Sequence, residues 1–205
     1  MILSAEQITP EREIRFTDSD GNGLFRLPDE GNLIITLFGG DEIVRPCVFV
    51  DDSHFAMGGS VHEMSAFAMK MERLGCCYRP EHPRPGDVLD TYEIYQLKDI
   101  RGAGYWYTPY EYAKSKIRPE HYEQAYRGVL APKVSLEALY NKHNRDKRPF
   151  REQTRSMSVS DIVVLKRNGE QKAFYVDRVG FAECKEFLNP PKRAKSQRKR
   201  QNPER

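Results

Sequence analysis

The sequence predicts an α+β fold, in which small antiparallel sheets with hairpins pack against a few short helices. The clearest sign is a hairpin over residues 162–176, because the β-branched run at residues 162–165 returns at residues 173–176 after Asn168-Gly169. This dipeptide accepts positive φ at both turn positions. A helical apolar spacing after Ser60 and a proline-rich stretch at residues 79–87 complete the pattern. Two modules of strands beside helices are therefore expected.

The elements before the proline-rich stretch form a first module. Residues 11–32 predict a strand followed by a long turn, and residues 33–38 and 43–50 predict a hairpin across GGDE. Ser60 and Glu63 match a capping box, and Gly75 is placed to end the helix that follows. The apolar residues with helical spacing are Val61, Met64, Ala68, Met71 and Leu74.

The second module begins after a boundary placed near Pro85. Residues 91–97 predict a strand, and residues 109–116 and 119–124 predict short helices that each open with proline. A third helix is expected at residues 135–143 with Ser135 as its cap. The predicted division is an N-terminal module at residues 1–85, a second module at 86–189 and a tail at 190–205.

Charge is unevenly distributed along the chain. The net charge is +3, but residues 189–205 hold seven Lys or Arg and one Glu, a net charge of +6, which leaves −3 for residues 1–188. This tail has little to bury, so it is expected to be disordered and to attract phosphate without sequence preference. Its candidate nucleic-acid-binding residues are Lys192, Arg193, Lys195, Arg198, Lys199 and Arg200.

The cysteine content and hydropathy favour a soluble cytoplasmic protein without a membrane partner. The four cysteines are not spaced like a disulfide framework, and no secretion signal is recognisable. The longest apolar run, residues 33–38, is far shorter than the roughly 18–20 residues that span a bilayer. Cys47 and Cys184 are expected to be small buried residues rather than nucleophiles. The sequence leaves the oligomeric state open.

Two patterns match metal sites in part. Residues 18–29 resemble the start of a calcium loop, and its candidate ligands are Asp18, Asp20, Asn22 and Asp29. Pro28 and the lack of an exit helix favour a turn joining two strands instead. A zinc site is disfavoured because adjacent cysteines lack the usual spacer. Its possible ligands are His54, His62, Cys76, Cys77 and His82.

Catalysis has one weak candidate and no recognisable local motif. Asp51, Asp52 and His54, with Glu63, are the residues from which a magnesium-dependent nuclease could be built, because acidic ligands need not be close in sequence. The simpler interpretation is a solvated turn with an Asx cap at a strand end. A binding protein without a cofactor is therefore favoured over an enzyme.

The densest aromatic patch lies in the second module and is followed by cations. Aromatic rings interleaved with cations suit stacking on unpaired bases, and they equally suit a protein interface. Some of these rings are expected to pack as core beneath the short helices. The candidate partner-binding residues are Tyr105, Trp106, Tyr107, Tyr110, Lys114, Lys116 and Arg118, with Tyr112 in the same patch.

The hairpin, together with TYEIYQLKD at residues 91–99 and LEALYNKHN at residues 136–144, resembles the YodL-like domain from about Tyr92 to Leu188. LPDEGN, VRPCVFVDDSHF and HEMSAFAMKMERLG, between about Leu27 and Gly75, are similar to a large polyvalent protein-associated domain. The two resemblances imply a protein of a conjugative element or phage. They imply no catalytic residues.

The function expected from this context is counter-defence, in which the protein binds and inhibits a CRISPR nuclease or a restriction enzyme. The partner would be the nuclease itself, its guide RNA or DNA. Two alternatives stay open at this point. One is a metal-dependent nuclease acting on guide RNA or DNA, and the other is a non-catalytic DNA-transfer accessory protein.

Overall fold

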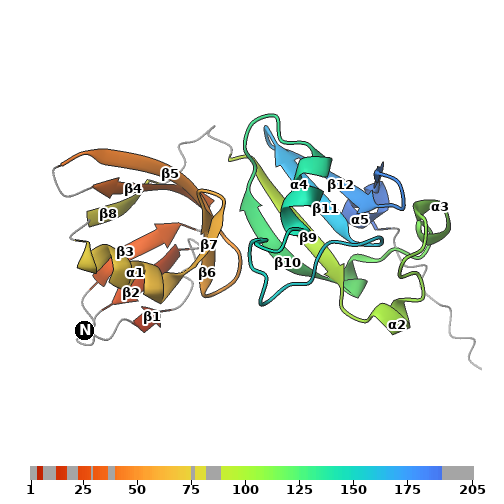
Figure 1. The fold of residues 1–205 in the computed structure, drawn as a ribbon, viewed down its shortest axis with the longest axis horizontal. Coiled ribbons are helices and arrows are strands. Elements are labelled where there is room, and N and C mark those ends of the chain that lie inside the picture. Colours follow the sequence, from red (N-terminus) through yellow and green to blue (C-terminus); the bar gives the residue numbers. More distant parts are fainter. Residues whose placement is uncertain are drawn as a thin grey trace, which may run out of the picture.

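A computed structural model describes residues 4–6, 13–17, 23–28, 30–36, 40–74, 77–81 and 89–190. The strands in this part of the chain form three antiparallel sheets (Figure 1). The first has the order β1 (Ser4–Glu6), β2 (Glu13–Thr17) and β3 (Gly23–Pro28). The second has the order β7-β6-β5-β4-β8 and contains β4 (Glu30–Thr36), β5 (Glu42–Phe49), β6 (His54–Met57), β7 (Ser60–Glu63) and β8 (Cys77–Glu81). The third has the order β10-β9-β11-β12-β13 and contains β9 (Thr91–Leu97), β10 (Tyr122–Val129), β11 (Ile162–Arg167), β12 (Glu170–Val176) and β13 (Phe181–Glu183).

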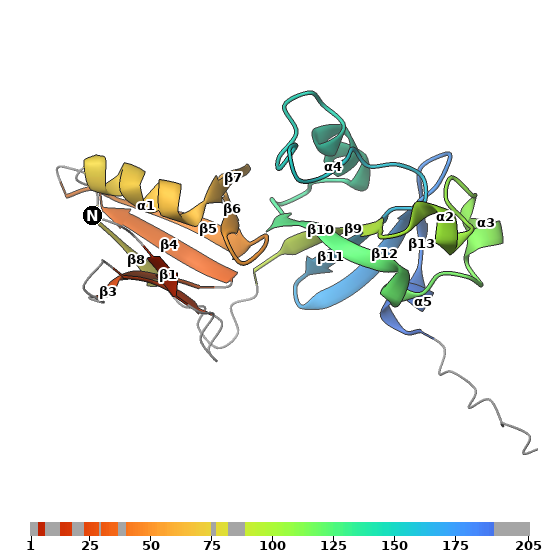
Figure 2. The ribbon, with the colours of Figure 1, turned by 90° about the horizontal axis from the view of Figure 1, so that it is seen from below.

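The helices are short and cover the sheets. They are α1 (Met64–Arg73), α2 (Ile100–Ala103), α3 (Tyr110–Ala113), the 3-10 turn η1 (Pro119–His121), α4 (Leu136–His143) and α5 (Lys185–Leu188). Figure 2 shows α1 on the second sheet and α4 on one face of the third sheet. The α+β prediction is confirmed. The boundary near Pro85 and the tail after Pro190 lie outside the described residues.

The predicted hairpin is confirmed as β11 and β12. Ile162 pairs with Tyr175 and Val164 with Ala173, and the turn between the strands has positive φ at Asn168 (49°) and Gly169 (83°). The dipeptide therefore adopts the turn that its residue types favour. The predicted strand at residues 91–97 is β9, which lies between β10 and β11. The predicted GGDE hairpin is the antiparallel pair β4 and β5.

Two predicted helices differ from the structure. Ser60 lies in β7, so α1 begins only at Met64, and the Glu63 carboxylate accepts the backbone N–H groups of Ser65 (3.2 Å) and Ala66 (2.7 Å). The predicted helix at residues 119–124 is wrong, because β10 begins at Tyr122 and pairs with β9. A register shift between Gln124 and Tyr126 interrupts the alternation that would have identified this strand. The predicted helix at 135–143 is confirmed as α4 with Ser135 as its cap.

The two halves of the chain, residues 4–81 and 89–190, each contribute to the core. One buried cluster lies between α1 and the second sheet and includes Leu33, Phe55 and Phe67. A second cluster joins the halves, because Val48 in β5 and Val50 just after it pack with Tyr92 and Tyr126 of the third sheet. A third cluster fills the space between the third sheet and α3 and α5. Burial of apolar surface therefore holds the halves together.

Polar contacts reinforce this junction. Glu30 of β4 accepts from Arg127 of β10 at 2.6 Å and from Lys166 of β11 at 2.8 Å. The Gln124 side-chain amide donates to the carbonyl of Val50 at 3.3 Å. One carboxylate of the first half is thus shared between two cations of the second, all of them half-buried or nearly buried.

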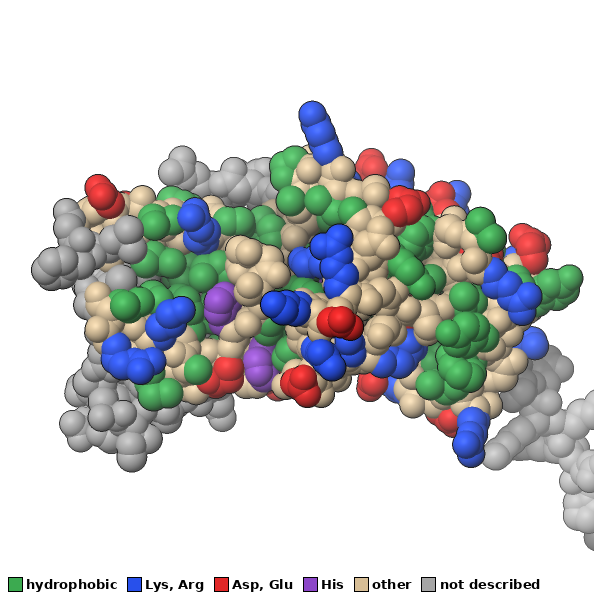
Figure 3. All heavy atoms as spheres, viewed as in Figure 1, with side chains coloured by type: hydrophobic (Ala, Val, Ile, Leu, Met, Phe, Trp, Pro, Cys, Tyr) green, Lys and Arg blue, Asp and Glu red, His purple; other side chains and the backbone are tan. Residues whose placement is uncertain are grey.

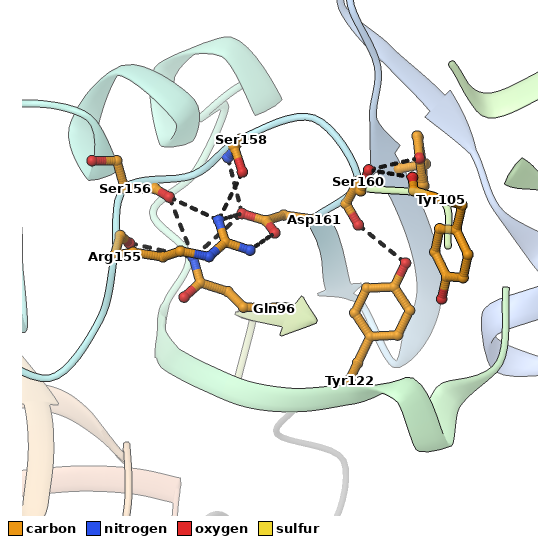
Figure 4. A network of polar contacts seen from close by, with 9 residues as sticks. Gln96, Tyr105, Tyr122, Arg155, Ser156, Ser158, Ser160 and Asp161 are labelled. Atoms are coloured by element: carbon orange, nitrogen blue, oxygen red, sulfur yellow. Dashed lines mark hydrogen bonds and ion pairs between the residues drawn. The ribbon is translucent and has the colours of Figure 1, made fainter. Parts of the chain in front are cut away.

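A buried polar network holds the segment that leads into β11 (Figure 4). Asp161 is fully buried, and its carboxylate forms a two-pronged ion pair with Arg155, one prong at 2.8 Å. It also accepts the backbone N–H of Ser158 at 2.9 Å and the Gln96 amide at 3.3 Å. Burial raises the pKa of Asp161, while Arg155 and the hydrogen bonds act in the opposite direction. The network ties the loop after α4 to β9 and β11.

Ser160, beside this network, has a strained backbone with φ of 84°. Its hydroxyl donates to the Tyr105 carbonyl at 3.0 Å, and its own carbonyl accepts from the Tyr122 hydroxyl at 3.0 Å (Figure 4). The Tyr175 hydroxyl lies 3.1 Å from the hydroxyl oxygen of Ser160. These bonds offset a conformation that costs on the order of 1–3 kcal/mol.

Candidate functional site

The turn between β5 and β6 contains the first catalytic candidates. One Asp51 carboxylate oxygen accepts the backbone N–H groups of Ser53 and His54, each at 2.8 Å. The His54 ring nitrogen Nδ1 lies 2.9 Å from the same oxygen. Burial alone would raise the pKa of Asp51, but these hydrogen bonds and the charge of His54 hold it below its usual value. The geometry is that of an Asx turn, the simpler interpretation of this sequence.

Glu63 and Asp52, the other acidic candidates, have different environments. Both Glu63 carboxylate oxygens bind the first turn of α1, and Asp52 is exposed. Burial acts to raise the pKa of Glu63, yet the hydrogen bonds from Ser65 and Ala66 lower it. Among the described residues, no group of three or more His, Cys, Asp or Glu side chains is arranged to hold a metal ion. The His54 ring instead contacts Phe150, with centroids 4.9 Å apart.

The other metal candidates are placed only in part. Asp18, Asp20, Asn22 and Asp29 lie outside the described residues, as do Cys76 and His82, while β2 and β3 pair antiparallel on either side of residues 18–22. His62 packs against Phe55 and Phe67, and burial lowers its pKa. Cys47 and Cys184 are buried, and desolvation raises the pKa of the two thiols to about 12 and about 11. Both thiols are therefore protonated near neutral pH, as a structural role requires.

The aromatic patch separates into core and surface. Tyr105 is fully buried, so its assignment to a partner-binding surface is wrong: its ring packs with Tyr122, and its hydroxyl lies 3.0 Å from Nδ1 of His121. Tyr110 is half-buried and donates to Glu186 at 2.8 Å. The exposed side chains are Trp106, Tyr107 and Tyr112, with 45%, 51% and 72% of their surface accessible.

These three exposed residues, which we call the aromatic surface, lie on the segment around α2 and α3. Trp106 and Tyr107 pack edge to face with ring centroids 4.7 Å apart, and Tyr107 has a φ of 56°. Figure 3 shows hydrophobic side chains gathered over this end of the molecule. Bulky residues rarely adopt positive φ, so the exposed position of the Tyr107 ring comes with some backbone strain.

The cations near the aromatic surface are partly engaged. Lys114 pairs with Glu111 at 2.8 Å, and this hydrogen bond raises the pKa of Lys114. Arg118 donates to the carbonyls of Ser115 (3.1 Å) and Ile117 (2.7 Å). Lys116 is exposed. The six tail cations from Lys192 to Arg200 lie outside the described residues, so their placement stays a prediction.

Two cavities at the junction of the halves are not predicted by the sequence. One is polar, with a volume of about 640 Å³, and is lined by Glu30, Asp51, Asp52, Glu93 and Arg127 among others. The other is mainly apolar, with a volume of about 820 Å³, and lies beside α4. Both depend on packing between residues far apart in the chain, for which a single sequence carries no periodic signal.

Comparison with known families finds a similarity in the second half of the chain. A family model described as a YodL-like domain matches residues 91–187. This region includes the third sheet, α4 and the aromatic surface. No curated protein and no solved structure matches the chain. Within the described residues, none of the helices is long and apolar enough to cross a membrane.

Proposed function

We propose that this protein, built around a YodL-like domain at residues 91–187, is a counter-defence protein of a mobile genetic element. In this proposal it binds and inhibits a host CRISPR nuclease or restriction enzyme in the cytoplasm, by contacting the nuclease, its nucleic acid or both. The resemblance of residues 27–75 to a large polyvalent protein-associated domain supports the mobile-element origin.

The aromatic surface carries the proposal. Trp106, Tyr107 and Tyr112 remain exposed although neighbouring Tyr105 is buried, and large aromatic side chains are concentrated at binding hot spots. The backbone of Tyr107 is strained although burial of its ring contributes little to folding, which supports a binding role for the exposed ring. The rings would meet an apolar pocket of the nuclease or stack on unpaired bases of its guide.

The hydrogen bonds and pKa values of the acidic candidates favour a binding protein over the alternative nuclease. Asp51 and Glu63 already satisfy backbone N–H groups, and both have pKa values below the usual range. A pair of carboxylates for general acid and base chemistry needs pKa values driven apart, whereas these two move in the same direction. A magnesium-dependent nuclease at this turn would have to break the Asx turn or the helix cap.

The first experiment measures phage or plasmid survival in cells that carry a CRISPR nuclease or a restriction system. We expect the chain to protect the invading DNA while the guide RNA stays at full length, because the protein acts by stoichiometric binding. Guide RNA that is shortened in cells with the wild-type protein, but not in cells with Asp52→Ala, would instead establish the nuclease. No protection against either system would leave the DNA-transfer accessory, whose DNA binding would depend on residues 191–205.

Replacing Trp106 with Ala is expected to abolish protection. Truncating a hot-spot aromatic costs about 2 kcal/mol of binding free energy, a loss of roughly 30-fold in affinity. The fold should survive because 45% of the Trp106 side chain is already accessible. Affinity for the nuclease that the survival assay identifies is measured by calorimetry, and the melting temperature reports the fold.

Val179→Ala is the matched control, since Val179 is 92% exposed in the turn between β12 and β13 of the same domain. This variant should protect and bind like wild type. Wild-type affinity in Trp106→Ala would remove the aromatic surface from the mechanism.

A further inference from the structure

The apolar hollow beside α4 has the construction of a ligand cavity. Its volume is about 820 Å³, within the roughly 300–1,000 Å³ of small-molecule sites. One wall comes from the second half of the chain and includes Leu89, Val129, Leu130, Val134, Ala138 and Leu139. The opposite wall comes from the first half, where Pro46 and the turn Gly58-Gly59 present little side-chain volume. The cavity therefore exists only where the two halves meet.

Two cations line this apolar cavity. Lys142, the residue before the end of α4, and Arg145, just after it, both contribute to the lining. The Lys142 amine lies 3.2 Å from the Tyr92 hydroxyl and 5.6 Å from the centre of the Tyr92 ring. Burial lowers the pKa of Lys142, as expected for an amine removed from water.

No carboxylate in the described part of the chain pairs with either cation. Asp90, the one acid in the lining, accepts the backbone N–H of Asn168 at 2.8 Å and so serves the β11–β12 turn. The Lys142 amine donates to the hydroxyl of Tyr92, which in turn lies 2.9 Å from Nε2 of the buried and neutral His143 ring. A partly buried positive charge without a counter-charge is costly, and an anion in the cavity would relieve that cost.

We propose that this cavity binds a small amphipathic anion, with an aliphatic or aromatic body against the apolar walls and one carboxylate or phosphate head held by Lys142 and Arg145. The cavity walls are mainly apolar and offer few hydrogen-bonding groups that could recognise the edge of a nucleic-acid base. Tyr92 is only 1% exposed, so it is not free to stack on a base. The site is separate from the aromatic surface, and the proposal does not rest on the counter-defence function.

The test is calorimetric titration of the full chain with octanoate, octyl phosphate and octanol. Octanol has the same apolar body without the charge, and inorganic phosphate alone has a head without a body. We expect saturable binding of at least one charged octyl compound and at least tenfold weaker binding of octanol and of phosphate, because each provides half of the interaction. The preferred head follows from the comparison of octanoate with octyl phosphate.

Variants locate the binding. Lys142→Gln should weaken the octyl anion at least tenfold while octanol is unchanged, and Ala138→Phe, on the exposed side of α4, should weaken both by filling the cavity. Lys172→Gln, an exposed lysine of β12 outside the cavity, is the matched control for loss of a charge. Circular dichroism confirms that each variant is folded. Equal binding of octanol and the anions, wild-type binding in Lys142→Gln and Ala138→Phe, or no saturable binding in the millimolar range would each overturn the proposal.

Discussion

Replacing Asp161 with Ala should lower the free energy of unfolding by about 3–5 kcal/mol, the cost of removing one partner from a buried ion pair. The carboxylate is fully buried and joins Arg155, Ser158 and Gln96. Its loss removes the counter-charge of the Arg155 guanidinium and leaves the Ser158 N–H without its acceptor. The segment that ends at the strained Ser160 would also lose its anchor.

Urea denaturation followed by circular dichroism measures this effect. A double-mutant cycle with Arg155→Ala isolates the pair: the double variant should lose less than the sum of the two single losses, because each single variant leaves a polar group unpaired. Asp146→Ala is the matched control, since Asp146 is exposed in the same loop, and it should change stability by no more than about 0.5 kcal/mol. A loss below about 1 kcal/mol for Asp161→Ala would show that the network does not hold the loop.

The elements that the sequence predicts well are those whose signals are local. Asn168-Gly169 determines a tight turn by backbone freedom alone, and β11 and β12 follow from the two apolar runs around it. Ser135 caps α4 because its side chain meets the N–H of Ala138, three residues away. In both cases the contact that forms the element lies within a few residues, so no tertiary information is needed.

The elements that were missed are defined by partners far along the chain. Pro119 suggests the start of a helix, but Tyr122 and Tyr126 lie in β10, where a bulge at residue 125 turns them to opposite faces of the sheet and into different buried clusters. Gly128 fits the same strand since a Cβ there would lie only 2.7 Å from the Tyr126 ring. Pairing with β9, not local propensity, makes this segment a strand.

The candidate site divides in the same way. Composition identifies an aromatic patch, yet only packing decides that Tyr105 is core while the next residue, Trp106, is exposed. The turn at Asp51 could be predicted, because an Asp side chain commonly accepts the backbone N–H of the residue two positions later, here Ser53, in an Asx turn. The cavity that contains Lys142 could not, because its opposite wall comes from residues more than eighty positions earlier.

The stability of the protein should fall steeply below pH 6.5 because of His143. This ring belongs to the last residue of α4 and is buried, with the Tyr92 hydroxyl 2.9 Å from Nε2 and the centre of the Tyr126 ring 4.6 Å from its own centre. Desolvation first, and then the charges of Lys142 and Arg148, lower the pKa of His143 from 6.5 to about 3. The folded state therefore disfavours the charged form of this ring, because its burial and the two nearby cations oppose a positive charge.

The sign follows from proton binding. Below pH 6.5 the unfolded chain takes up a proton at His143, whereas the folded chain does so only near pH 3, so acidification favours unfolding. The contribution is complete above pH 6.5 and is lost at roughly 1.4 kcal/mol per pH unit as the pH falls through this window. Between pH 6 and pH 4 the expected loss is therefore about 2–3 kcal/mol from this residue.

Urea denaturation of wild type and His143→Gln across pH 4–7.5 measures the effect. Gln places an amide near Nε2 that can accept the Tyr92 hydroxyl but does not titrate, so its stability should depend less on pH by about 1 kcal/mol or more per unit. His121→Gln, which alters the histidine that contacts Tyr105, is the matched control and should keep the wild-type slope because His143 remains. Parallel pH profiles for wild type and His143→Gln would mean that folding does not lower the pKa of His143, and would contradict the prediction.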